Sequence, residues 1–115
     1  MASSANSSLD FDAQQASAQS PWQIACEALD SGKCLQISLK DSVRIFEVHR
    51  VGINAKGDHI LSGWQIRGPT YERVGWKLIN LEDNLDLALT GISSLAPRPD
   101  YRRGAKQFIR IICQL

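Results

Sequence analysis

Three cysteines and two histidines are the residues of this chain that could supply a thiolate or an imidazole to a reaction or a metal ion. Cys26 and Cys34 are separated by seven residues, and no Cys-x-x-Cys pair occurs. His49 and His59 lack the i, i+4 spacing of a helical zinc pair, so a zinc site would require them to face each other across paired strands. The sequence therefore predicts no metal site and no cofactor.

Motifs of nucleophilic catalysis and phosphate transfer do not occur in the sequence. There is no Gly-x-Ser-x-Gly and no glycine-rich phosphate loop. A Cys113 thiolate with a histidine base stays open, although a cysteine in an IICQL run is more typical of an inert core residue. Three carboxylates share one polar turn, which is typical of a solvated connection: Glu82, Asp83 and Asp86. We expect no catalytic residues and a protein that is not an enzyme.

Arginines and aromatic rings are the residues best suited to recognition. Eight arginines outnumber five lysines, and the planar guanidinium suits phosphate oxygens and stacks on bases. Aromatic residues are interleaved with these charges: Trp64, Tyr71, Trp76 and Tyr101. This combination predicts a surface for single-stranded nucleic acid or a nucleotide. The alternative is that Trp64 and Trp76, which lie within predicted strands, pack in the core.

Positive charge is concentrated in two segments, although the whole chain carries only +1. Residues 44–77 hold six basic and three acidic residues, a net +3. Residues 97–115 hold five basic residues and one acidic residue, a net +4. If the two segments meet in space, they form a basic face.

The first 20 residues differ in composition from the rest of the chain. Ser, Ala and Gln dominate residues 1–20, so this segment cannot bury enough apolar surface to offset the entropy of ordering it. We predict a disordered tail there and a single domain over residues 21–115. The alternative is that Leu9 and Phe11 dock in a groove of this chain or of a partner.

A short amphipathic helix is predicted at the start of the domain. Ser20 suits an N-cap and Pro21 suits the first helical position. From Trp22 onward, apolar residues recur at i, i+3, i+4 and i+7, and the pattern ends near Gly32.

Short alternating segments separated by turns follow, with a hairpin turn at residues 54–57. The predicted strands cover residues 34–40, 43–50, 59–66, 75–81 and 85–91. This pattern indicates a mainly β fold (α+β by content), a small and strongly curved antiparallel sheet or barrel. In the C-terminal run FIRIICQL the apolar residues recur at helical spacing, so we favour a helix there, with an edge strand as the alternative.

The cysteine count and the hydropathy pattern bear on the compartment. An odd and small number of cysteines favours free thiols in a reducing cytoplasm. No stretch approaches about 18 apolar residues, and no basic region followed by an apolar run opens the chain. We therefore expect a cytoplasmic protein without a membrane partner.

Four segments carry a resemblance to small stand-alone members of the WYL-domain class: residues 44–57, 60–66, 75–82 and 97–104. The first is similar to the basic–Glu–Pro–His start of that family, with Val48 where Pro is usual. The second resembles the aromatic signature strand, the third the following strand, and the fourth a Pro-rich closing loop. The chain departs from the family at Asn80 and Asp83, where basic residues are common.

The resemblance implies a compact SH3-like or Sm-like β-barrel that acts as a ligand-sensing regulatory module in bacteria, with nucleic acid or nucleotide-type ligands. Family members usually carry a helix-turn-helix, for which this chain has no room ahead of residue 34, so the chain would be the sensor part alone. The resemblance points to five site residues: His49, Arg50, Trp64, Gln65 and Lys77. The charge and aromatic patterns add three more: Tyr101, Arg102 and Arg103.

The function that the sequence predicts is thus non-catalytic binding of an anionic ligand. Arg50, Lys77, Arg102 and Arg103 would contact phosphate, and Trp64 or Tyr101 would stack on a base. The alternative is an assembly module, a homodimer formed through edge strands or the C-terminal run.

Overall fold

The structure is a computed structural model that describes residues 19–83, 85–102 and 106–115. Its first element, helix α2 (Pro21–Ser31), has the bounds that the sequence predicts. The Gln23 side chain accepts a hydrogen bond from the Ser20 backbone N–H at 2.9 Å. Gly32 ends the helix in the left-handed region at φ 70°, a conformation that costs glycine little. The predicted tail lies outside the described residues, except for Gln19 and Ser20.

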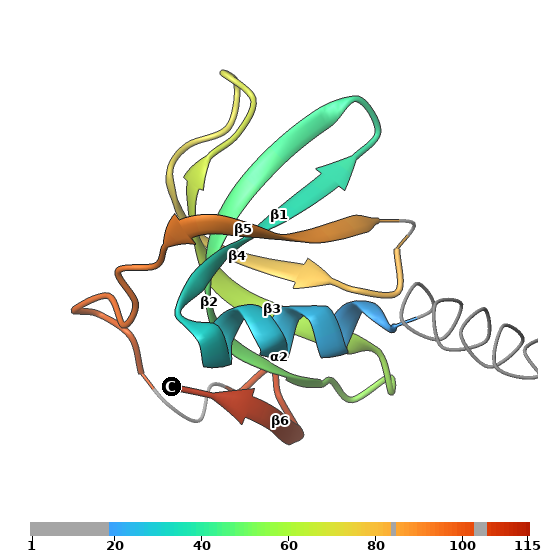
Figure 1. Cartoon of the computed structure of the whole chain (residues 1–115). Coiled ribbons are helices and arrows are strands. Elements are labelled where there is room, and N and C mark those ends of the chain that lie inside the picture. The colour runs from blue at the N-terminus through green and yellow to red at the C-terminus, as the bar shows by residue number, and fades with distance from the viewer. Residues whose placement is uncertain (1–18, 84, 103–105) are drawn as a thin grey trace, which may run out of the picture.

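Six strands are described, and they pair in one antiparallel sheet (Figure 1). They are β1 (Lys33–Leu39), β2 (Ser42–Ile53), β3 (His59–Arg67), β4 (Gly75–Asn80), β5 (Asp86–Ser93) and β6 (Arg110–Gln114). The order is β4-β3-β2-β1-β5, and β6 pairs with β2. Of the described residues, 51% are strand and 12% helix, so the prediction of a mainly β fold with an antiparallel sheet is confirmed. The sheet is open.

Strand β2 is long enough to pair with two strands, one after the other, along the same edge. Its first part, from Ser42 to Phe46, pairs with β1, and its last part, from Arg50 to Ile53, pairs with β6. Strand β3 pairs along the opposite edge. Residues 44–52 are buried without interruption, which is the pattern expected of a central strand covered on both faces.

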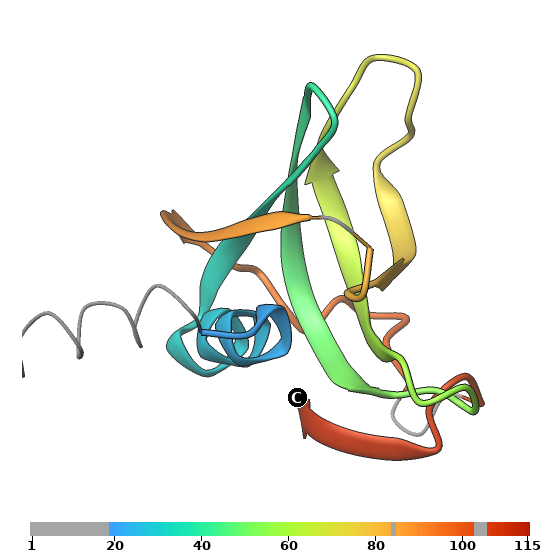
Figure 2. The ribbon, with the colours of Figure 1, turned by 90° about the vertical axis from the view of Figure 1, so that its right-hand side faces the viewer.

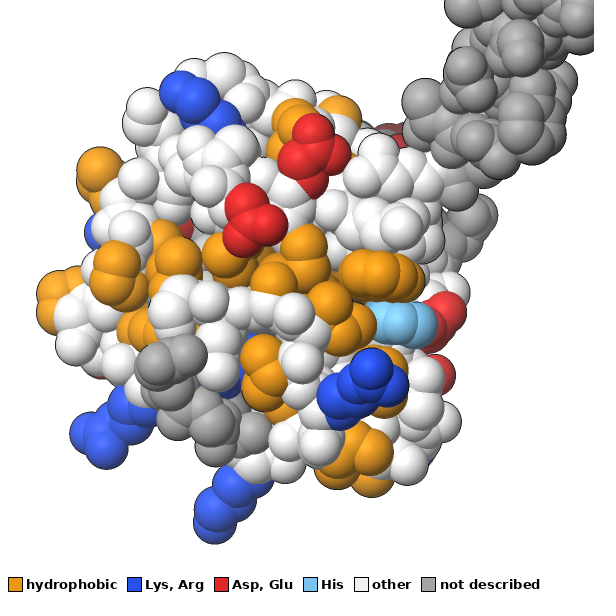
Figure 3. Space-filling model, turned by 60° about the horizontal axis from the view of Figure 1, so that its bottom comes forward, with side chains coloured by type: hydrophobic (Ala, Val, Ile, Leu, Met, Phe, Trp, Pro, Cys, Tyr) orange, Lys and Arg blue, Asp and Glu red, His pale blue; other side chains and the backbone are white. Residues whose placement is uncertain are grey.

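The two faces of the sheet are covered differently. Helix α2 packs on one face (Figure 2), where Phe46, Val48, Val51 and Leu61 form the core. Segment 94–102 lies on the other face, which we call the outer face, and is held there by hydrogen bonds to β2. At the lower end of the molecule a band of hydrophobic side chains crosses the surface, and Lys and Arg side chains project along its lower border (Figure 3).

A β-bulge changes the face on which Arg50 lies. Simple alternation predicts His49 and Arg50 on opposite faces, but the register with β3 shifts between Val48 and Arg50. Val48 and Val51 both belong to the core, although they are three residues apart. The extra residue therefore leaves His49 and Arg50 together on the outer face, so the prediction from alternation is wrong here.

The C-terminal run is a strand, so the helix that the sequence favours there is wrong. Where β1 leaves β2, the second part of that edge has unpaired backbone groups, and β6 supplies their partners from Arg110 to Gln114. Backbone bonds extend the pairing, from Ile109 N–H to the Ile53 carbonyl and from Leu115 N–H to the His49 carbonyl. Tertiary pairing thus overrides the local helical spacing.

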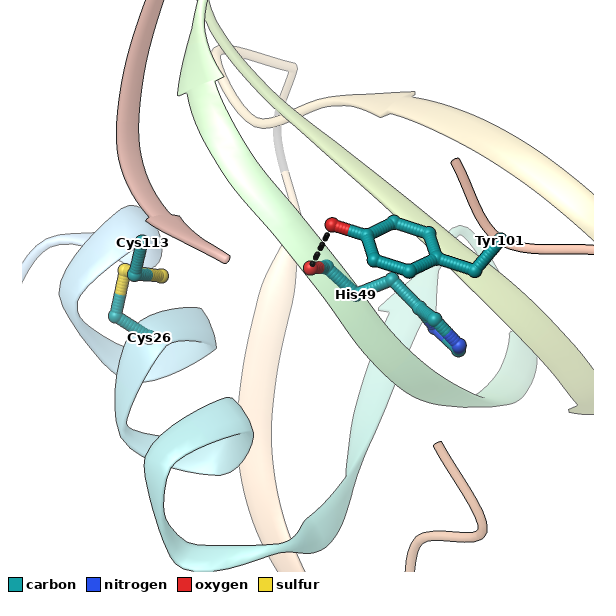
Figure 4. Close-up of a disulfide and its surroundings, with 4 residues drawn as sticks. All are labelled: Cys26, His49, Tyr101 and Cys113. Atoms are coloured by element: carbon teal, nitrogen blue, oxygen red, sulfur yellow. Dashed lines mark hydrogen bonds between the residues drawn. A yellow bond between two sulfur atoms is a disulfide. The ribbon is translucent and has the colours of Figure 1, made fainter. Parts of the chain in front are cut away.

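Cys26 and Cys113 form a disulfide that joins α2 to β6, with 6.0 Å between their Cα atoms (Figure 4). The expectation of three free thiols is therefore wrong, and with it the idea of a Cys113 thiolate nucleophile. Cys34 is free and buried, and burial raises the pKa of its thiol.

Among the described helices none is long and apolar enough to cross a bilayer.

Candidate anion-binding site

A pocket of about 430 Å³ opens on the outer face, between strands β2, β3 and β4 and the segment that follows β5. Its walls contain basic, acidic and aromatic side chains together. The lining residues are Arg50, Ser62, Trp76, Lys77, Leu78, Asp100, Tyr101, Arg102 and Gln107. The two positive segments of the sequence therefore do meet, because Arg50 and Lys77 come from one and Arg102 from the other.

Arg50 is held in place at the base of this pocket, with only 1% of its surface exposed. Its Nε donates to Gln114 Oε1 at 3.2 Å, and its Nη2 donates to the Arg102 carbonyl. The guanidinium carbon lies 5.0 Å from the centre of the Tyr101 ring and 5.2 Å from that of Phe108. None of the ion pairs among the described residues includes Arg50. A buried cation without a carboxylate partner favours an anion beside it.

Two aromatic rings form the wall next to this cation. The Trp76 and Tyr101 rings are 6.2 Å apart and inclined by 28°. The Trp76 indole N–H donates to Asp100 Oδ2 at 2.7 Å, and the Tyr101 hydroxyl donates to the His49 carbonyl at 3.2 Å (Figure 4). Both rings are half-buried, so part of each is available to a flat ligand.

His49 lies behind these rings and supports the segment that carries them. Its ring is 4.7 Å from Trp76 and 5.0 Å from Tyr101. Nδ1 donates to the Glu47 carbonyl at 2.9 Å, and Nε2 accepts the Arg98 backbone N–H at 2.9 Å. Both nitrogens are thus used by the neutral ring, and burial lowers the pKa of His49. His49 is a structural residue here and does not line the pocket.

Trp64 is covered by an ion pair rather than exposed to a ligand. Arg98 Nε donates to Glu47 Oε1 at 2.6 Å, and the Arg98 guanidinium lies 5.1 Å from the Trp64 ring centre. The second Glu47 oxygen accepts the Leu95 backbone N–H at 2.8 Å. Because Glu47 is 1% exposed, these bonds fix segment 94–102 to β2 at a buried point.

Gln65 belongs to a different cluster. Its Nε2 donates to Glu72 Oε1 at 3.0 Å, and Arg44 binds both oxygens of the same carboxylate, at 2.9 and 2.8 Å. The hydrogen bonds from Arg44 and then Gln65 lower the pKa of Glu72 to about 2. The charge of Arg44 is therefore paired with Glu72, and Arg44 does not line the pocket.

Lys77 lines the pocket, but its side chain is not aligned with the rings. In the register of β3 and β4, Trp76 is opposite Trp64 and Lys77 is opposite Gly63, so strand alternation places the Lys77 side chain on the other face. In agreement with this, the Lys77 charge helps to lower the pKa of Glu72. The pocket's cations are therefore Arg50 and Arg102.

The structure thus brings four of the eight predicted site residues to one pocket: Arg50, Lys77, Tyr101 and Arg102. His49, Trp64 and Gln65 lie outside its lining, and Arg103 lies outside the described residues. The sequence singled out Trp76 only as a general aromatic residue, and it missed Asp100. The alternation of Trp76 and Leu78 places both residues on one face of the strand. Only the pairing of β4 with β3 shows that this face is the outer one.

His49 and His59 do not face each other. His59 pairs with Ile53 at the far end of β3, its ring stacks on Trp22 at 5.7 Å, and its Nδ1 lies 2.8 Å from Glu82 Oε2. Within the described part of the chain, no three His, Cys, Asp or Glu residues gather as a metal site would require.

No protein-family model, no curated protein and no solved structure matches this chain. The resemblance to the WYL-domain class therefore stays a prediction from the sequence.

Proposed function

We propose that this chain is a non-catalytic binding module for an anionic ligand, a nucleic acid or a nucleotide. The observation that carries the proposal is that buried Arg50, exposed Arg102 and the Trp76–Tyr101 ring pair line one pocket. Guanidinium groups match phosphate oxygens, and partly exposed rings stack on bases of any sequence. The resemblance to the WYL-domain class, with its SH3-like or Sm-like barrel, is consistent with this ligand class and is part of the proposal.

The roles of the residues follow from how each is held. Arg50 is immobilised by four neighbours, so it offers a phosphate a charge at little entropic cost. Arg102 is exposed and adapts to the ligand. Asp100, which already accepts the Trp76 indole N–H, can accept an exocyclic amino group of a base with its other oxygen.

Fluorescence anisotropy of a labelled single-stranded oligonucleotide at low salt tests the proposal. We expect binding that weakens as salt rises, since phosphate contacts release counterions. Arg102→Ala removes one contact and lowers the salt slope by about 0.7. Arg73→Ala is the matched control, because Arg73 is exposed but does not line the pocket. If the intact protein binds neither oligonucleotide nor nucleotide at low salt, the proposal is wrong.

A homodimer is the alternative, supported by edge strand β5. Within the part of the chain that the structure describes, this strand pairs only with β1, and it exposes Leu89 (42%) and Ile92 (39%). The C-terminal run is a weaker candidate than the sequence suggests, since β6 is already paired with β2. Light scattering would support this alternative if it finds a dimer that Leu89→Lys dissociates, without oligonucleotide binding.

The disulfide bears on the compartment. Disulfides persist in oxidising compartments and are rare in a reducing cytoplasm, so a cytoplasmic location requires the chain to fold with Cys26 and Cys113 reduced. Alkylation of thiols in intact cells, followed by mass spectrometry, separates the two cases. Alkylated Cys26 and Cys113 support a cytoplasmic location, and protected ones support an oxidising compartment.

A further inference from the structure

A second hollow of about 380 Å³ adjoins the pocket and shares two lining residues with it, Leu78 and Gln107. Its other lining residues are Asn54, Ala55, Lys56, Asp58, Ile60, Asn80, Lys106 and Ile109. Along β4, the alternate residues Trp76, Leu78 and Asn80 pass from the first hollow into the second. The two hollows therefore form one groove on the outer face, which we call the outer groove.

Charge and apolar surface both continue along the outer groove. The second hollow adds Lys56 and Lys106 to the two arginines of the first. Its one carboxylate, Asp58, already accepts the Asn80 side-chain N–H at 3.1 Å. Between the charges, Leu78 is 49% exposed and Ile109 is 66% exposed. The second hollow thus repeats the chemistry of the first, with cations beside apolar surface.

Lys56 is held at the end of the groove by the hairpin turn between β2 and β3. The Asn54 side-chain oxygen accepts the backbone N–H groups of Lys56 and Asp58, at 3.0 and 2.9 Å. The Gly57 N–H donates to the Asn54 carbonyl at 3.0 Å. The Asn54 N–H also donates to the Asp58 carbonyl at 3.0 Å. Four hydrogen bonds therefore close the turn, and they fix the point from which the lysine side chain extends.

We infer that the outer groove takes a single-stranded nucleic acid several nucleotides long in preference to a mononucleotide. This inference rests on the proposed function. A mononucleotide has one base and one phosphate group, for which the first hollow suffices, whereas a strand presents a further base and phosphate to Leu78, Ile109 and the two lysines. A duplex hides its base faces in the stack, so the apolar part of the groove favours a single strand.

The test measures affinity against strand length and salt. The probes are fluorescent oligothymidylates of about two to twelve nucleotides, thymidine monophosphate, and a duplex of about twelve base pairs. Each phosphate contact with a single strand is taken to add about 0.7 to the salt slope. The variant is Lys56→Gln with Lys106→Gln, and its control is Lys40→Gln with Arg73→Gln, which removes the same charge at exposed residues outside the groove.

We expect affinity to rise with length and then level off, and the lysine variant to reduce the salt slope for the long strand by about 1.4. Between about 50 and 200 mM salt, the intact protein then loses about sevenfold more affinity than the variant. Thymidine monophosphate binding should not change in the variant. Equal affinity for mononucleotide and long strand, tighter binding of the duplex, or equal effects of variant and control would overturn the inference. Binding of mononucleotide without length dependence would leave the proposed function standing, whereas no binding of any probe would remove both.

Discussion

Reduction of the disulfide should destabilise the fold by an amount that follows from its position in the chain. Cys26 and Cys113 are 87 residues apart. When such a loop is opened, the unfolded chain gains entropy, and the chain-entropy model gives a loss of about 4.6 kcal/mol in the free energy of unfolding. That is a large part of the stability expected of a domain of this size, about 5 to 15 kcal/mol.

The loss should begin at β6. This strand has five residues, and β2 is its only partner among the described strands, so without the covalent link to α2 it can open by itself. Gln114, the residue after Cys113, accepts a hydrogen bond from Arg50 at 3.2 Å, and the same oxygen lies 3.4 Å from the Tyr101 hydroxyl oxygen. Opening of β6 should therefore also loosen the ring and the cation of the pocket.

Urea unfolding with and without a dithiol reductant measures the effect, and amide hydrogen exchange locates it. The double variant Cys26→Ala with Cys113→Ala should match the reduced protein and should not respond to the reductant. A change below about 1 kcal/mol on reduction, or equal exchange at Ile109 and Leu115 in both states, would refute the reasoning.

Two further predictions concern the outer face and β6. Because burial lowers the pKa of His49, the unfolded state takes up a proton at a higher pH than the folded state, so the free energy of unfolding should fall as pH drops below about 6.5. Urea unfolding of the intact protein and of His49→Gln at several pH values checks this. An equal pH dependence in the two proteins would contradict it. A Cβ on Gly52 would lie 2.2 Å from the Arg110 carbonyl oxygen and 2.7 Å from Phe108 Cδ2, so Gly52→Ala should separate β6 from β2 and cost about 1 to 3 kcal/mol. Gly91→Ala, which has open space around it, is the comparison, and similar urea midpoints for the two variants would show that the close approach does not matter.

The local elements were predictable because short-range chemistry decides them. Ser20, Pro21 and Gly32 set the ends of α2, and Asn54 with Gly57 closes the hairpin turn. The strands follow from alternation, since each has a core face. These signals lie within a few residues of the structure that they specify.

The remaining errors arise where distant segments compete with local preference. The C-terminal spacing fits a helix, but the unpaired edge of β2 is visible only once β1 and β2 are paired. The disulfide joins residues that the sequence gives no reason to pair. The bulge beside His49 leaves no signal in the alternation, yet it brings Arg50 to the outer face and so creates the cation of the pocket.

The sequence was sufficient to predict the kinds of side chain at the candidate site, basic and aromatic, but not which residues line the pocket. The resemblance to the WYL-domain class led to Arg50, charge by segment led to Arg102, and aromatic interleaving led to Tyr101. His49 is buried, and Trp64 is half-buried beneath Arg98. Neither residue lines the pocket, because each makes a structural contact with segment 94–102.

The central claim is that a ligand enters beside the Trp76–Tyr101 pair, and the indole N–H resonances of the three tryptophans test it directly. Trp76 lines the pocket, Trp64 lies under Arg98, and Trp22 belongs to α2, on the opposite face of the sheet. On addition of a short single-stranded oligonucleotide, we predict that the Trp76 resonance shifts most and the Trp22 resonance stays in place. A shift confined to Trp22, or three unchanged resonances at saturating oligonucleotide, would contradict the account.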